Sequence, residues 1–557
     1  MIRDTSCLLG RAISVICPDL ARLQRLETQP RFAIEGFYTQ LGKAGILPTA
    51  RLVEKLRNME PLLASLEKKD HYTHMFSCLL LGDAIIDKLY VGRRDVSCQV
   101  YKALKLLWLN IAASHDIAYP IEEAETEISE FFEAYFGKRI ATCYPVDKTT
   151  YFTFGQFPNY KSRILRLLAG RVVKTSEGAT SVKRQLDGLT LHYLATRGDH
   201  AILSALLLMM AIEDSALSAS GGRLTDGTRQ QIDKDLASVL TDHQKESRFR
   251  AVSQALYEVL PCRGAVERFQ DVAGSVVYLH NLHKWRSYMA KELAAFSAEA
   301  DVAAKNADKT SGSPTKKLAD VSRKHPYADF VLAAHARNGN DDTGSVLTEA
   351  AGLARTEIDK LKSLSIPDCA PPMEPLKKGS ETDYVRFLGL LLAVVDTVQE
   401  WGRDRDQAAR SRLIAVKGIE VARTTAAGGR QVTLQVGGPK LVFPTDCPAS
   451  VKMTKVDGDT KWCVTSASNS QLGEFIECEW PGERKNIEYA KDMLDRAVKR
   501  HADEEAALWL QCMIALELHK CLKPVYPVGN DALIKVQFQQ VEQLDEKPFV
   551  VELGSIG

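Results

Sequence analysis

The sequence predicts a mainly α-helical protein that ends in a smaller α+β domain. The first observation is the spacing of apolar residues in the N-terminal two thirds of the chain. They recur at intervals of three and four in "RLVEKLRNMEPLLASLEKK" (51–69), "SCQVYKALKLLWLNIAAS" (97–114) and "HAILSALLLMMAIED" (200–214). This period is typical of helices with one buried face. A fourth segment, "FLGLLLAVVDTVQEW" (387–401), is strongly apolar and extends the helical pattern.

The second observation is a change of pattern after about residue 412. "RQVTLQVGGPKLVFP" (430–444) places two β-rich runs around Gly-Gly, which predicts a hairpin. "IKVQFQQV" (534–541) and "PFVVEL" (548–553) alternate as strands do, and 483–522 is a long helical segment between them. Strands and helix together predict an α+β domain.

Three regions follow from these patterns. We expect an N-terminal helical segment over 1–64, a helical domain over 65–411 and an accessory α+β domain over 412–557. Residues 298–320 are polar and contain no aromatic side chain. Such a composition buries too little apolar surface to offset ordering, so we expect a flexible insertion there.

Composition restricts the classes of function. The chain has 72 Lys and Arg against 71 Asp and Glu, which argues against a broad nucleic-acid surface. Apolar runs fall short of the roughly 20 residues that span a membrane, and the first residues lack the signal-peptide pattern, so we expect a cytoplasmic protein. The 12 cysteines are scattered and form no CxxC pair, which favours buried reduced thiols over a zinc ribbon.

Metal-type side chains interrupt or end the apolar helical segments. They occur where composition alone would place leucine, at His74, His115, Asp116, His200, His280 and Asp396. A buried carboxylate without a partner is very costly. Imidazole and carboxylate together bind Mn, Fe, Zn, Ni or Mg. We therefore predict a site for one or two divalent metal ions.

The order of these residues resembles the HD-domain superfamily of metal-dependent phosphohydrolases. "HDIAYP" (115–120) is similar to the central His-Asp turn of that family, and the likeness covers roughly residues 65–405. It implies a helical bundle with the metal at its centre. In that resemblance His74 is the first ligand, His115 and Asp116 are the central pair, and Asp396 is the closing ligand. His200 and His280 match two further histidines found in members that hold two metals.

The resemblance also implies an activity, which is hydrolysis of a small phosphorylated substrate such as a nucleotide. Asp116 would bridge the ions, and His200 or His280 would bind the second ion or protonate the leaving oxygen. A homodimer is compatible with this interpretation. The chain departs from the family at Ala118, where Gly is usual and where many members have Lys. Arg197 or Lys284 is the alternative source of that cation.

These departures leave two other functions open. One is an inactive scaffold of the same fold that binds a nucleotide or a protein partner. The other is a di-iron oxygenase, since helical bundles of this type also hold two irons.

Each candidate residue also has a structural alternative. His71 competes with His74 for the first position, and the His115-Asp116 pair could simply cap a helix C-terminus. Asp199 before His200 is a plausible helix N-cap. His280 could be a core histidine, and Asp396 could form an ion pair with Arg386 or Arg403.

Overall fold

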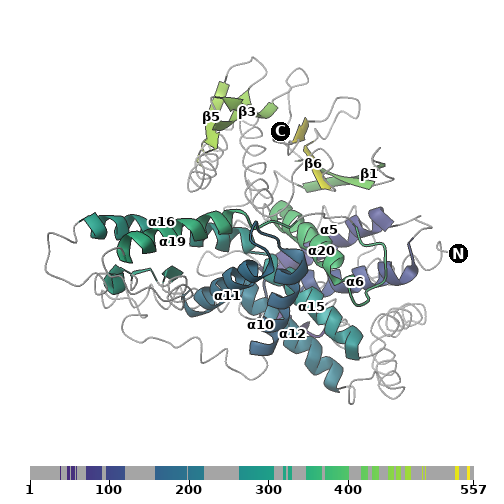
Figure 1. Cartoon of the computed structure of the whole chain (residues 1–557). Helices are drawn as coiled ribbons and strands as arrows, with labels where there is room; N and C mark the ends of the chain where they lie inside the picture. The colour runs from purple at the N-terminus through teal and green to yellow at the C-terminus, as the bar shows by residue number, and fades with distance from the viewer. Residues whose placement is uncertain are drawn as a thin grey trace, which may run out of the picture.

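The computed structural model describes a mainly helical protein (Figure 1). The described residues are 71–90, 96–119, 157–196, 199–218, 263–305, 346–366 and 371–399, seven strands between 415 and 551, and scattered residues within 38–58, within 318–328 and at 492 and 496. The expected boundaries near residues 64 and 411 fall outside them. Within the described part, no helix is both long and apolar enough to cross a membrane.

The helices follow the predicted apolar segments. Their bounds are α5 His71–Tyr90, α6 Cys98–Ala112, α10 Phe157–Leu167, α11 Ala179–Thr196, α12 His200–Ser218, α15 Arg263–Leu279, α16 Leu282–Lys305, α19 Val346–Lys362 and α20 Glu381–Gln399. A π-helical turn, η2 (Leu168–Val172), continues α10. Local sequence fixes several ends. Ser97 caps α6 by accepting a hydrogen bond from the backbone N–H of Val100.

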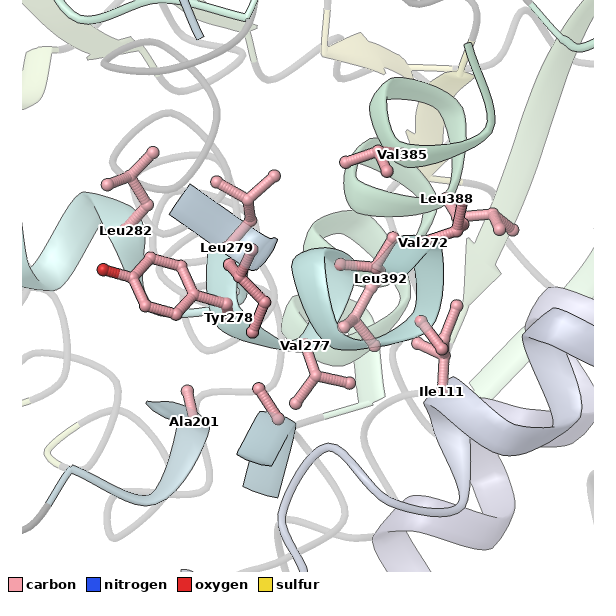
Figure 2. Close-up of a cluster of buried hydrophobic side chains, with 14 of the residues drawn as sticks. Ile111, Ala201, Val272, Val277, Tyr278, Leu279, Leu282, Val385, Leu388 and Leu392 are labelled. Carbon is pink, nitrogen blue, oxygen red and sulfur yellow. The ribbon is translucent and has the colours of Figure 1, made fainter. Parts of the chain in front are cut away.

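Helix α15 lies at the centre of the bundle and packs against α6, α10, α12 and α20. Figure 2 shows its side chains Val272 and Val277 among residues of the neighbouring helices. Leu388 and Leu392 come from α20 and Ile111 from α6, and all five side chains are fully buried. This apolar packing fixes how the helix ends lie relative to one another.

Helices α5 and α6 approach closely where α5 has a glycine. A Cβ atom on Gly82 would lie 2.0 Å from Cζ2 of Trp108, so only glycine admits the indole at this point. The Trp108 Nε1–H donates to the carbonyl of Leu79 at 2.9 Å. The close contact holds the two helices in a fixed register.

The expected flexible insertion over 298–320 is wrong in its first part. Residues 298–305 continue α16, which lies beside α19 (Figure 1). Ala300 is fully buried, and Ser297 Oγ donates to the carbonyl of Ala351 at 3.2 Å. Alanine is the strongest helix former, and its small side chain lets helices pack closely. The absence of aromatic residues therefore did not prevent this segment from forming a packed helix. Residues 306–317 lie outside the described part.

The strands lie in two sheets. One has the order β1-β2-β6-β7, from β1 Ala415–Arg423, β2 Arg430–Gly437, β6 Ile534–Phe538 and β7 Phe549–Val551. The other has the order β3-β4-β5, from β3 Ser450–Val456, β4 Asp459–Thr465 and β5 Gln471–Glu477.

The pairing of β2 differs from the hairpin that the sequence predicts. Residues 430–437 do form a strand, but its antiparallel partner is β1, with Arg423 opposite Arg430. Its other neighbour, β6, runs parallel to it. The second half of the predicted hairpin, 440–444, lies outside the described residues. The Gly-Gly signal is local, whereas strand pairing is decided by contacts between distant segments.

Candidate metal centre

The six predicted ligands come together at one end of the bundle. His74 lies in the first turn of α5, His115 and Asp116 follow α6, His200 begins α12, His280 follows α15, and Asp396 lies in the last turn of α20. His71 joins them from the start of α5. We call these seven residues the histidine cluster: His71, His74, His115, Asp116, His200, His280 and Asp396. The core residues in Figure 2 explain the convergence, because Ile111, Ala201, Leu279 and Leu392 each lie within one turn of a cluster residue.

Asp396 is the meeting point of three imidazoles. Its Oδ1 lies 2.7 Å from His74 Nε2 and 3.5 Å from His115 Nε2, and its Oδ2 lies 2.8 Å from His280 Nε2. The alternative of an ion pair with Arg386 is not supported, because that guanidinium donates to the carbonyl of Arg171. Arg403 lies outside the described residues.

Asp116 forms the second meeting point. Its Oδ2 lies 2.8 Å from His71 Nδ1 and 3.6 Å from His115 Nε2, and its Oδ1 lies 3.4 Å from His200 Nε2. His71 also stacks on Tyr119, with ring centroids 3.4 Å apart. The two histidines that compete for the first position thus lie on different carboxylates, His74 on Asp396 and His71 on Asp116.

His115 lies between the two carboxylates. Its Nδ1–H donates to the carbonyl of Ala112 at 2.9 Å, which fixes the tautomer and leaves Nε2 for the centre. The turn that carries His115 and Asp116 is held by a hydrogen bond from Ala118 N–H to Ser204 Oγ at 3.0 Å. A second bond joins Ser114 to Thr49 at 2.7 Å. The Ala118 position thus retains a structural role through its backbone.

The side chains behind His200 hold its ring in place. Asp199 Oδ1 caps α12 by accepting from the N–H groups of Ala201 and Ile202, which confirms the predicted N-cap. Its Oδ2 accepts from Trp285 Nε1 at 2.7 Å and lies 3.4 Å from Asn281 Nδ2. The carboxylate thereby orients the amide, whose Nδ2 is also 3.2 Å from His200 Nε2. Donation by the Asn281 amide to Nε2 holds the ring in place in the metal-free protein, with this nitrogen 3.4 Å from Asp116 Oδ1.

In the contacts described above, both carboxylates of the cluster lie against imidazoles. Burial by itself raises the pKa of Asp116, but His115, His71 and His200 outweigh burial and hold that pKa well below its usual range. Burial likewise opposes ionisation of Asp396, and His280 and His115 hold its pKa well below the usual range. For His115, burial disfavours the cation, yet Asp116 and Asp396 raise its pKa above the ordinary 6.5. Each carboxylate therefore requires positive charge beside it.

Asp396 is the most exposed residue of the histidine cluster. The side chain of Asp396 is 19% exposed, whereas His74, His115, Asp116 and His280 are each at most 4% exposed. A ligand from solution would approach along Asp396. Of the two cations considered as replacements for the missing Lys, Lys284 is exposed, and Arg197 lies outside the described residues.

Sequence reasoning missed Cys78, which belongs to the same centre. Its Sγ lies 3.3 Å from His74 Nε2. The described residues provide two overlapping sets of potential ligands, His74, Cys78, His115 and Asp396 in one and His115, Asp116 and His280 in the other; the donor atoms within each set lie within 4.8 Å of one another. The spacing His-x-x-x-Cys in "HMFSC" places both side chains on one helix face, and this signal was available in the sequence.

Comparison with known proteins adds no relative from which a function could be transferred. No protein-family model, curated protein sequence or solved structure matches the chain. The function must therefore be inferred from the chemistry of this site.

Proposed function

We propose that the protein is a metal-dependent hydrolase of phosphate esters, of the HD type. The observation that carries this proposal is the convergence of one buried carboxylate, one partly buried carboxylate and five buried histidines from five separate helical segments. A structural core would not gather this many polar groups, because each costs free energy to bury. Metal ions are the common reason for such a set.

The donor atoms fit a metal. Ligands about 2.0–2.2 Å from one ion lie roughly 3.0–3.4 Å from one another in octahedral or tetrahedral arrangements. His115 Nε2 lies 3.5 and 3.6 Å from Asp396 and Asp116, too long for good hydrogen bonds but close to that separation. His74, His115, Asp116 and Asp396 would hold the first ion. His200 or His280, with Asp116, would hold the second.

In the proposed reaction the metal ion and the side chains of the cluster have different roles. A bound divalent ion supplies Lewis acidity and can generate hydroxide from water near neutral pH. Asp116 presents its two oxygens to different histidines, which suits a bridging carboxylate. His200 and His280, with ring centroids 5.8 Å apart, are the candidates to protonate a leaving oxygen. A small phosphorylated substrate would approach along Asp396, and we propose nucleotides as its first class.

The first test is the metal content of the purified full-length protein. We expect one or two equivalents of transition metal in the wild type and none in the His115→Ala, Asp116→Ala double variant, with the helical circular dichroism of both retained. The matched control is His325→Ala, Glu299→Ala, because this pair is also a histidine and a carboxylate in contact, at 3.2 Å, outside the cluster. It should keep the metal.

The second test is a screen of phosphomonoesters, phosphodiesters and nucleotides with the metal-loaded protein. Hydrolysis lost in the double variant and retained in the control supports the proposal. Metal binding without hydrolysis of any substrate would favour the inactive scaffold, for which the Ala118 departure argues. A mixed-valent di-iron spectrum would favour the oxygenase. No metal in the wild type, even after incubation with Mn, Fe or Zn, would refute the metal-dependent enzyme.

The remaining expectations are part of the same proposal. We propose that the C-terminal strands and the segment 483–522 form an α+β accessory domain that gates the site or mediates a homodimer. We also propose a cytoplasmic location. Size measurement of the full chain and of a variant truncated at residue 411 would test the first point.

A further inference from the structure

Cys78 occupies a position that the proposed phosphohydrolase site does not require. It lies one turn after His74 on α5, is fully buried, and has its Sγ 3.3 Å from His74 Nε2 and 3.8 Å from His74 Nδ1. It also lies within 4.8 Å of donor atoms on His115 and Asp396. A buried thiol usually packs against apolar neighbours. This thiol instead faces an imidazole and a carboxylate.

One short hydrogen bond connects these groups in the contacts that the structure shows. Asp396 Oδ1 lies 2.7 Å from His74 Nε2, so the single Nε2–H donates to that carboxylate. Within the cluster, the S–H of Cys78 is left with the more distant Nδ1 of the same ring, 3.8 Å from Sγ, as its imidazole acceptor. A second nitrogen, His115 Nε2, is buried, and Asp396 Oδ1 is 3.5 Å from it. Four potential ligand atoms therefore converge around a single short hydrogen bond.

We infer that Cys78 is a direct metal ligand, and that with His74, His115 and Asp396 it forms a site for a thiolate-accepting ion such as zinc. On binding, the thiol releases its proton to solvent and a zinc–sulfur bond forms. Thiolate ligands select zinc and similar ions, whereas magnesium requires oxygen ligands in octahedral geometry. This inference rests on the proposed function, because it identifies the ion at the same centre. It excludes magnesium as the resident metal there.

The decisive experiment is X-ray absorption at the zinc edge, on the full chain loaded with one equivalent of zinc. A sulfur ligand lies about 2.3 Å from zinc, and nitrogen or oxygen ligands lie about 2.0–2.2 Å from it, so the shells are distinguishable. We expect one sulfur scatterer in the wild type and none in Cys78→Ser. The matched control is Cys98→Ser, at the start of α6, the end opposite to His115. It should retain the sulfur scatterer.

Zinc affinity gives an independent measurement. Loss of a partner behind a ligand already weakens binding by about 10–100-fold, so loss of the ligand itself in Cys78→Ser should weaken it at least tenfold. If Cys78→Ser does not fold, as judged by circular dichroism, Cys78→Ala replaces it, and the wild-type spectrum still decides whether sulfur is bound.

The outcomes separate this inference from the proposed function. Zinc bound through nitrogen and oxygen alone in the wild type would overturn the role of Cys78 and leave the hydrolase proposal intact. A sulfur scatterer that persists in Cys78→Ser would also overturn it, because another cysteine would then be the ligand. Failure of the wild type to bind any metal would refute both.

Discussion

Helices α5 and α6 carry two buried polar clusters that neutralise their charges in different ways. The histidine cluster lies where α5 begins and α6 ends. The second cluster, which we call the lysine cluster, consists of Asp83, Asp87, Tyr101 and Lys105. Lys105 is fully buried, pairs with Asp83, and lies 2.7 Å from Asp87 Oδ1.

The lysine cluster contains its own permanent cation. Burial disfavours the charge on Lys105, but Asp83 and Asp87 outweigh burial and raise its pKa. One lysine serves two carboxylates, so burial and the charge of Asp87 raise the pKa of Asp83 to about 6 in spite of Lys105. In the histidine cluster, by contrast, the carboxylates contact imidazoles, which carry a positive charge only when they are protonated. The comparison teaches that the lysine cluster contains its own cation as folded, whereas the described contacts of the histidine cluster supply positive charge through protonated imidazoles or a bound metal ion.

The largest expected effect is on stability, from Lys105→Met. Removing the cation leaves Asp83 buried and uncompensated, so the free energy of unfolding at pH 7 should fall by about 3–5 kcal/mol. Urea titration measures it. The double variant Lys105→Met, Asp83→Leu should recover most of the loss, because both charges are then absent. Full loss in the double variant would show that the pair contributes no specific charge compensation.

Zinc should affect the two clusters differently. At a free concentration 100 times its Kd, zinc should raise the free energy of unfolding of the wild type by about 2.7 kcal/mol. The increase should be absent in Asp396→Asn and present in Lys105→Met, because only the first variant lacks a ligand. Thermal unfolding with and without a chelator measures this. A response lost equally in both variants would contradict this difference between the two clusters.

The support behind His200 should have a moderate effect on metal binding. Asn281→Ala removes the amide that positions the His200 ring, so zinc affinity should fall by about 10–100-fold. The matched control is Gln270→Ala, a buried amide on α15 that donates to the carbonyl of Met209 at 2.7 Å outside the cluster. The control should lose stability without losing zinc affinity. Titration calorimetry distinguishes the two, and equal losses of affinity would contradict a specific role for Asn281.

The smallest effect concerns pH. The pKa of His115 is raised in the metal-free fold, so its stabilising charge is fully present below pH 6.5 and is lost as pH rises through the folded-state pKa. Zinc replaces that proton, so the stabilisation by zinc should grow as pH rises above 6.5.

The lysine cluster should respond in another pH window. The folded state favours protonated Asp83, so its contribution to stability declines as pH rises from about 4 to about 6. Urea titrations from pH 4 to 8, with and without zinc, distinguish the pH range in which Asp83 titrates from the range in which His115 titrates. A stabilisation by zinc that is independent of pH would contradict a protonated His115 in the metal-free protein.

Several features could be predicted from local sequence because their causes are local. Apolar spacing located α6, α12 and α20, and Asp199 was identifiable as an N-cap from its place before an apolar run. The same local reasoning failed over 298–305, where an alanine-rich polar segment is a packed helix. Composition describes what a segment contains, but the neighbour against which it packs decides whether it is ordered.

By itself, the sequence determined that imidazoles and carboxylates lie at the ends of apolar helices, since this depends only on residue type and period. Only the tertiary structure decided their partners. His74 and Asp396 are separated by 322 positions and meet at 2.7 Å, and no local rule assigns His71 to one carboxylate and His74 to the other. Tertiary packing likewise determines that Cys78 lies beside His74 and that the Asn281 amide faces His200. The physical reason is that helix packing through α15 fixes which ends converge, and packing depends on the whole core at once.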